Sequence, residues 1–198
     1  MEPTLETITP EDGLWDRVFV VSPLVLVGTR EEDGGYDLAP KHQATPIGWG
    51  AYFGFVCTPQ HRTWQNAKRE KTFTVSYPRP SQVLLSSFAA APRCEDGAKP
   101  ALAALPTMPA RVVEGVLLRD ATLHLECELD RLIPGFGVAG LIVGRIVAAH
   151  VDERALRSPD RDDADLIEES PLLAFLPPSR FAEIKDTNAY PFHAGTRY

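Results

Sequence analysis

Residues 23–76 read PLVLVGTREEDGGYDLAPKHQATPIGWGAYFGFVCTPQHRTWQNAKREKTFTVS, and this stretch decides the fold. An apolar run over Pro23–Thr29 leads into a Gly34-Gly35 turn, a second extended run covers Tyr36–Thr45, and a third covers Ala51–Thr58. Valine and the aromatic residues suit a pleated strand, and glycine supplies the positive φ that a tight hairpin needs. The stretch therefore predicts three strands in succession, with a tight turn between the first two.

A helical pattern follows the third strand and begins at Thr63, which is the expected N-cap residue. The N-terminus of a helix presents free N–H groups and a partial positive charge, so it favours an anion, typically a phosphate. Arg62 adds a charged donor beside it, and the edge of the preceding strand can hydrogen-bond a planar polar ring. The arrangement predicts a phosphorylated cofactor laid along the wall of a β-barrel.

Five segments carry a resemblance to a known family: Pro23–Val27, Asp33–Gly35, Asp37–Pro40, Ala51–Thr58 and Arg62–Asn66. They match, in order, an apolar strand near a proline, an acidic-Gly turn, an Asn-x-Ala-Pro segment, an aromatic or apolar strand, and a basic residue followed by Thr, two residues and Asn. The paired late strands of the same pattern are matched by Leu125–Cys127 and Gly144–Asp152. From about Pro23 to Leu156, the chain resembles the flavin reductase-like proteins, which are FMN-binding split barrels.

The resemblance implies a cofactor, FMN, and a reaction, the reduction of flavin by NADH or NADPH. Electrons would pass to free flavin, a partner oxygenase or another acceptor, and the apolar side of the barrel would be buried in a homodimer. Since the flavin does the hydride chemistry, no catalytic acid–base pair is expected. The positions that the resemblance assigns to cofactor binding are Asp37, Leu38, Ala39, Pro40, Lys41, His42, Gln43, Cys57, Thr58, Arg62, Thr63 and Asn66.

Asp37 departs from the family pattern, because Asn is usual at this position. Aspartate offers no amide donor and adds a negative charge to the site. A turn residue that bonds its own backbone is the alternative interpretation of Asp37. Lys99 also has two interpretations, a residue near the flavin and an exposed loop lysine, and the second is favoured.

Two other functions stay open at this point. One is an FMN protein that is not a reductase, either a flavin store or an enzyme of the pyridoxamine-phosphate oxidase type. The other is a barrel without cofactor that acts as an interaction module. Bleaching of bound flavin by a nicotinamide nucleotide distinguishes the reductase from both.

Composition narrows the class of protein. The chain has 198 residues, 44% of them hydrophobic, and a net charge of −7, which argues against a nucleic-acid or anionic-membrane surface. No apolar run approaches the roughly 20 residues of a membrane helix, and no secretory signal is visible. The cysteines lack metal-binding spacing, so we expect no metal and a reducing, cytoplasmic setting; they are Cys57, Cys94 and Cys127.

The remaining sequence predicts a mainly β, Greek-key-like split barrel with a few short helices, in one domain over 1–198 with its core at about 17–156. Further strands are expected at 72–77, 111–118, 121–132 and 138–151, with a helix at 81–90 and a loop at 134–137. In 121–132 the alternation predicts one core face and one wet face, which puts His124 on the surface. The tail over 171–198 is too apolar to be free and should pack on the barrel or in a dimer interface, with His193 and Tyr198 near a partner's cofactor.

Overall fold

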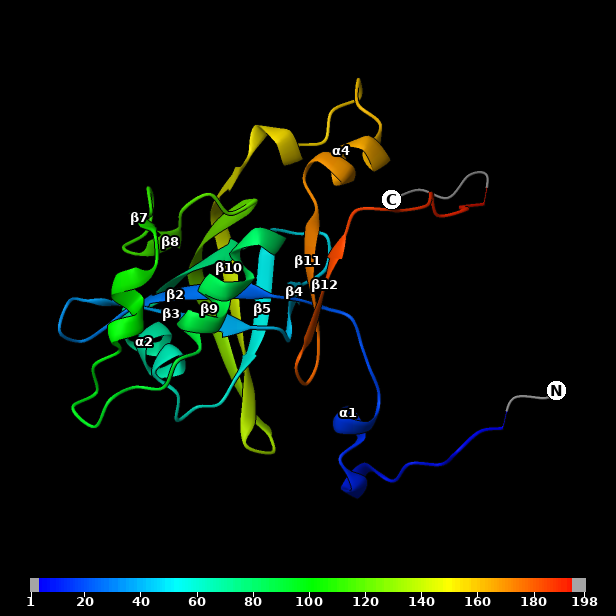
Figure 1. The fold of residues 1–198 in the computed structure, drawn as a ribbon. Helices are drawn as coiled ribbons and strands as arrows, with labels where there is room; N and C mark the ends of the chain where they lie inside the picture. Colours follow the sequence, from blue (N-terminus) through cyan, green and yellow to red (C-terminus); the bar gives the residue numbers. More distant parts are fainter. Residues whose placement is uncertain (1–3, 194–198) are drawn as a thin grey trace.

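The computed structural model describes residues 4–193 and is mainly β, with a few short helices around the strands (Figure 1). The strands are β1 (Ser22–Pro23), β2 (Val25–Arg30), β3 (Tyr36–Lys41), β4 (Ala44–Pro46), β5 (Tyr52–Cys57), β6 (Thr72–Tyr77), β7 (Thr107–Pro109), β8 (Val116–Leu118), β9 (Leu123–Phe136), β10 (Ala139–Val151), β11 (Leu172–Leu176) and β12 (Arg180–Ile184). The α-helices are α1 (Leu14–Arg17), α2 (Arg62–Glu70), α3 (Val83–Ala89) and α4 (Asp163–Glu169). Short 3-10 turns cover Pro10–Asp12, Pro80–Gln82, Pro100–Ala104 and Glu153–Ala155.

The main sheet is antiparallel and has the strand order β3-β2-β6-β9-β10-β5-β4. Strands β3 and β4 follow each other directly in the chain, yet they form the two opposite edges of this sheet. The sheet must therefore curl until its edges meet, and the link between them is made at Gln43, whose carbonyl accepts from Val56 N–H at 2.8 Å. This curled sheet is the split barrel that the sequence predicts.

The inside of the curl is filled by large apolar side chains from strands on opposite sides of the sheet. Phe55 and Phe73 meet edge to face with ring centroids 5.3 Å apart, and both are buried. The register of β10 against β9 shifts at Gly140 and at Gly144. Such irregularities let a long strand bend around the barrel.

The predicted wet face of residues 121–132 is confirmed at Glu128, which is half-exposed, but is wrong nearer the start of the strand. His124 and Glu126 lie on that face but are buried beneath residues 107–118, a segment that we call the cover segment. It was expected to be strand over 111–118, but it forms the β7–β8 hairpin with an irregular link at 111–115. The link is held by Glu126, whose carboxylate accepts the N–H groups of Arg111, Val112 and Val113 at 2.9, 2.6 and 2.8 Å. Polar side chains at period two therefore bind a covering loop rather than water.

Other boundaries differ from the prediction for local reasons. Thr63 is not the N-cap of α2, because the extended residue before the helix is His61, whose carbonyl accepts from Trp64 and Gln65. The strand β9 continues through the predicted loop at 134–137 and turns only after Phe136. Residues 18–21 lie outside the strands, since β1 begins at Ser22.

The C-terminal segment forms a second, smaller sheet with the order β1-β11-β12. Leu173 and Ala174 of β11 are buried, while Phe181, Tyr190 and Phe192 are largely exposed. Tyr198 lies outside the described residues, and the role expected for His193 stays a prediction. Within residues 4–193, no helix has the length and apolar character needed to cross a membrane.

Candidate functional site

The start of α2 is fixed against the barrel by its buried face. Trp64 and Ala67 are buried, and the Trp64 ring lies so close to Gly140 that a Cβ on that residue would be 2.6 Å from it. The first N–H groups of any helix lack intrahelical acceptors, so those of Arg62 and Thr63 are available to a ligand. The Arg62 side chain is 53% exposed and stands at the first helical position.

Two positions of the cofactor motif point into the protein. Asn66 is buried, donates from Nδ2 to Thr29 Oγ1 at 3.1 Å and accepts from Arg69 Nη2 at 3.0 Å. Thr63 is also buried. These contacts fasten α2 to the end of β2, so Asn66 holds the helix that carries Arg62.

Five charged side chains meet beside the start of α2, and we call them the charged cluster: Glu31, Asp37, Arg62, Arg93 and Lys99. Asp37 lies 3.2 Å from Arg93 Nη2 and 3.0 Å from Lys99 Nζ. The interpretation of Asp37 as a turn residue is therefore wrong, because this carboxylate sits in β3 and is paired with two cations. The favoured interpretation of Lys99 as an exposed loop lysine is also wrong: its side chain is 7% exposed and also donates to the Leu38 carbonyl at 3.0 Å.

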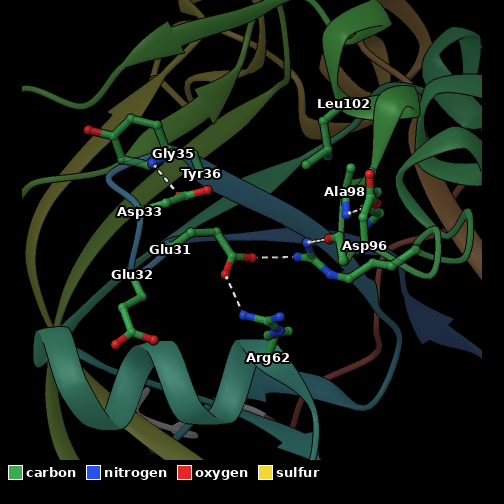
Figure 2. A pocket seen from close by; sticks show the side chains of 12 residues that line it. Glu31, Glu32, Asp33, Gly35, Tyr36, Arg62, Asp96, Ala98 and Leu102 are labelled. Atoms are coloured by element: carbon green, nitrogen blue, oxygen red, sulfur yellow. Dashed lines mark hydrogen bonds and ion pairs between the residues drawn. The ribbon is translucent and has the colours of Figure 1, made fainter.

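All members of the charged cluster except Asp37 line a cavity of about 590 Å³ between α2, the β2–β3 turn and the loop around Gly97. Figure 2 shows Glu31 reaching across this cavity toward Arg62. Glu32, Asp33, Tyr36, Asp96 and Leu102 complete much of the lining. A cavity with both guanidinium and carboxylate groups can bind a ligand that carries an anionic group and a polar body.

Strand β3 offers its backbone at the edge of the sheet, because it pairs only with β2. Pro40 has no N–H, so it tolerates this position well. Ala39, Pro40 and Lys41 are half-buried, whereas Leu38 is buried in the core. Among these residues, the main-chain groups that point away from β2 belong to Leu38 and Pro40, and the Leu38 carbonyl already accepts from Lys99, which leaves the Pro40 carbonyl to accept from a planar ligand.

The turn after β3 brings Lys41 to Cys57 at the end of β5. Burial raises the pKa of the Cys57 thiol, and the nearby Lys41 ammonium offsets part of this effect. Thr58 follows Cys57 and is half-buried. The structure thus brings Lys41 and Cys57, from two separate parts of the predicted cofactor set, close together.

His42 and Gln43 line a different, smaller cavity with Trp15 and Phe175. The His42 and Phe175 rings have centroids 5.0 Å apart and are tilted by 44°. Burial, followed by the charge of Lys41, lowers the pKa of His42, so the imidazole is neutral at pH 7. The aromatic contact with Phe175 was not expected, because β11 is far away in the sequence.

Sequence patterns also missed Glu31 and Arg93 as members of the site. Glu31 follows directly after β2 and precedes the glycine turn, which is the one local signal that it stands at a strand end. Arg93 belongs to an irregular loop, and its place depends on contacts with residues about 60 positions earlier. No local pattern carries that information.

Comparison with known proteins bears on the fold and the family of the chain. A family model described as the flavin reductase like domain matches residues 17–174. Among solved structures, the chain is similar to nitrilotriacetate monooxygenase component B from Bacillus cereus, with a TM-score of 0.82, 19% identity, and 96% of this chain and 100% of that chain covered. It is also similar to flavoredoxin of Desulfovibrio vulgaris (Miyazaki F), with a TM-score of 0.75, 22% identity, and coverage of 99% and 100%.

A third solved structure is an NADH:FAD oxidoreductase from Streptomyces globisporus, with a TM-score of 0.70, 17% identity, and coverage of 91% of this chain and 98% of that chain. At these identities the solved structures support the split-barrel fold alone. No curated protein sequence matches the chain. The family match spans most of the sequence, and the chain belongs to the flavin reductase-like family.

Proposed function

We propose that the chain is an FMN-binding, NAD(P)H-dependent flavin reductase. One observation carries the proposal: an exposed guanidinium, Arg62, stands at the first position of α2 and lines a cavity together with Gly35 and Tyr36, where β3 begins. A helix N-terminus with an adjacent arginine suits a phosphate, and a strand edge suits the polar rim of a flavin ring.

The residues present fit such a cofactor. Arg62 Nη1 lies 3.6 Å from the Glu31 carboxylate, which is longer than a hydrogen bond, so the guanidinium keeps donors for a phosphate. The first N–H groups of α2 add to that site. Thr63 and Asn66 would support the phosphate site indirectly, because they pack α2 against the barrel.

The ring of the flavin would lie along residues 37–43, with Cys57 and Thr58 at the end of the neighbouring strand. The Pro40 carbonyl, which points away from β2, would orient the ring, and the Lys41 ammonium would stabilise negative charge on it. A bound flavin supplies the hydride chemistry, and the protein supplies binding and orientation. Asp37 is already paired with Lys99 and Arg93, so it would act by holding the edge of the cavity in place.

The proposed electron donor is NADH or NADPH, and the proposed acceptor is free flavin or a partner oxygenase. Support comes from similar proteins named as an NADH:FAD oxidoreductase and as a monooxygenase component. We further propose a homodimer in a reducing, cytoplasmic setting. Exposed apolar side chains at the tip of the β9–β10 hairpin and the free thiols of the three cysteines support these two points.

The test is anaerobic absorption spectroscopy of the purified protein with FMN or FAD, before and after NADH or NADPH. The proposal expects bound FMN to bleach on addition of one nicotinamide nucleotide. Bound flavin that stays oxidised with both nucleotides would favour the store or oxidase-type alternative. Absence of any flavin binding would leave the interaction module, and preferential binding of FAD would correct the cofactor.

A further inference from the structure

The Glu31 carboxylate stands between two guanidinium groups. Its Oε2 lies 3.6 Å from Arg62 Nη1, and its Oε1 accepts from Arg93 Nη2. Its side chain is 10% exposed, so little water reaches this carboxylate. The tight turn after β2 fixes its backbone, because Glu31 N–H donates to the Gly35 carbonyl at 2.7 Å and Gly34 N–H donates to the Glu31 carbonyl at 3.1 Å.

The two arginines are held very differently. Arg93 bonds Glu31, lies 3.2 Å from Asp37, and donates to the Gly97 carbonyl at 2.9 Å. Arg62 has a looser contact with Glu31 and is more exposed than Arg93, by 53% against 24%. An incoming anion can therefore recruit Arg62 much more readily than Arg93.

The charged cluster contains three cations and two carboxylates, and Glu32, Asp33 and Asp96 add further carboxylates to the lining of the cavity, so the lining as a whole has no excess of positive charge. Arg62 is the most exposed of the three cations and stands at the start of α2. A phosphate at that position would approach the Glu31 carboxylate as a like charge and would compete with it for Arg62.

We propose that Glu31 is an internal counter-ion that competes with a ligand phosphate for Arg62 and thereby limits the preference for phosphorylated over unphosphorylated flavin. This inference rests on the proposed function for its ligand, but its chemistry can be tested with inorganic phosphate alone. Glu31 stays with Arg93 when the phosphate binds, and only the Arg62 contact is exchanged. The residue acts on affinity and specificity and takes no part in hydride transfer.

The test compares wild type with Glu31→Gln and with the matched control Glu32→Gln, which removes an exposed charge from the lining of the same cavity. We expect Glu31→Gln to bind FMN about tenfold more tightly, the order of effect for one nearby charge in a partly screened site. Riboflavin lacks the phosphate, and its affinity should change by less than about twofold on the same reasoning. The control Glu32→Gln should change the affinity for FMN, and the affinity for riboflavin, by less than Glu31→Gln changes the affinity for FMN.

Inorganic phosphate separates this inference from the proposed function. The phosphate-induced rise in melting temperature should be larger in Glu31→Gln than in wild type, whether or not the protein binds flavin. Equal or weaker phosphate and FMN binding in Glu31→Gln would overturn the inference, as would an equal gain for riboflavin. If Glu31→Gln does not fold, Glu31→Asp must show a smaller gain of the same kind, in affinity for FMN over riboflavin. Its shorter carboxylate cannot span both arginines.

Discussion

At the scale of single residues, His124 shows how burial couples protonation to stability. The imidazole lies on the covered face of β9 with Nδ1 3.2 Å from Ser76 Oγ. Burial first, and then the charges of His150 and Arg111, lower its pKa from 6.5 to about 4. The folded protein therefore keeps this residue neutral where the unfolded chain would bind a proton.

This predicts a loss of stability in mild acid. The unfolded state takes up the proton below about pH 6.5 and the folded state only near pH 4, so stability falls as pH is lowered through this window. The shift corresponds to about 3 kcal/mol over the whole window. Urea unfolding of wild type and His124→Gln at several pH values between 4 and 7 measures it. An equally steep pH dependence in His124→Gln would refute the assignment.

Asn66 gives a second prediction at this scale. Asn66→Ala removes the hydrogen bonds to Thr29 and Arg69, so both side chains lose their partner in Asn66. This should lower the free energy of unfolding by about 1–3 kcal/mol. FMN affinity of the folded fraction should change little, because the amide points away from the cavity. Chemical denaturation and flavin titration of the same sample measure both. Lost FMN binding with unchanged stability would make Asn66 a direct ligand.

At the scale of elements, the cover segment is held by a buried carboxylate. Burial alone would raise the pKa of Glu126, but the N–H groups of the 111–113 link and the nearby His150 lower it overall. Because the pKa of Glu126 is lower in the folded state than in the unfolded state, its ionised carboxylate stabilises the folded protein at pH values above the unfolded-state pKa. This stabilisation is lost as the pH falls through the folded-state pKa. This effect acts in more acidic solution than the titration of His124.

Glu126→Gln should therefore loosen the cover segment. The amide keeps one acceptor oxygen but places an NH2 group against the N–H groups bound by the other oxygen, and we expect a loss of about 3 kcal/mol. Hydrogen exchange should accelerate at Arg111, Val112 and Val113 well before it does in β5 and β10. Glu128→Gln, on the same strand but half-exposed, is the matched control. Unchanged exchange at the 111–113 link would contradict this role.

The elements also show which parts of the fold can be predicted. Strands 25–30, 52–57 and 72–77 follow from local apolar patterns, because each is buried within one sheet. The family motif located the start of α2 and the exposed Arg62. By contrast, the charged cluster depends on Arg93 and Lys99, which reach β2 and β3 across about 60 residues. The buried polar face of β9 likewise depends on a loop that no periodicity reveals.

At the scale of the whole molecule, the β9–β10 hairpin extends beyond the other strands (Figure 1). Strand β6 pairs with β9 as far as Glu128, and Leu129 N–H still donates to the Lys71 carbonyl, so among the described residues β10 is the strand partner of 130–136. Phe136 is 60% exposed and Val138 is 81% exposed near the tip. Clustered exposed apolar side chains are typical of an interface between subunits.

A dimer through this hairpin predicts the effect of charge at its tip. The double change Phe136→Asp and Val138→Asp should convert a dimer to a monomer, because it places carboxylates in an apolar contact. Sedimentation equilibrium measures the mass, and Leu5→Asp, another exposed apolar position, is the control. A monomeric wild type would contradict the dimer. A dimer that the double change leaves intact would place the interface elsewhere.

The most direct test of the central claim is an FMN titration of wild type, Arg62→Ala and Lys68→Ala, followed by flavin fluorescence. Lys68 is an exposed cation farther along α2, so its variant controls for net charge. We predict that Arg62→Ala weakens FMN binding by about 10- to 100-fold, as expected for a charged hydrogen bond, while Lys68→Ala stays near wild type. Equal FMN affinity in all three proteins would contradict a flavin phosphate at the start of α2.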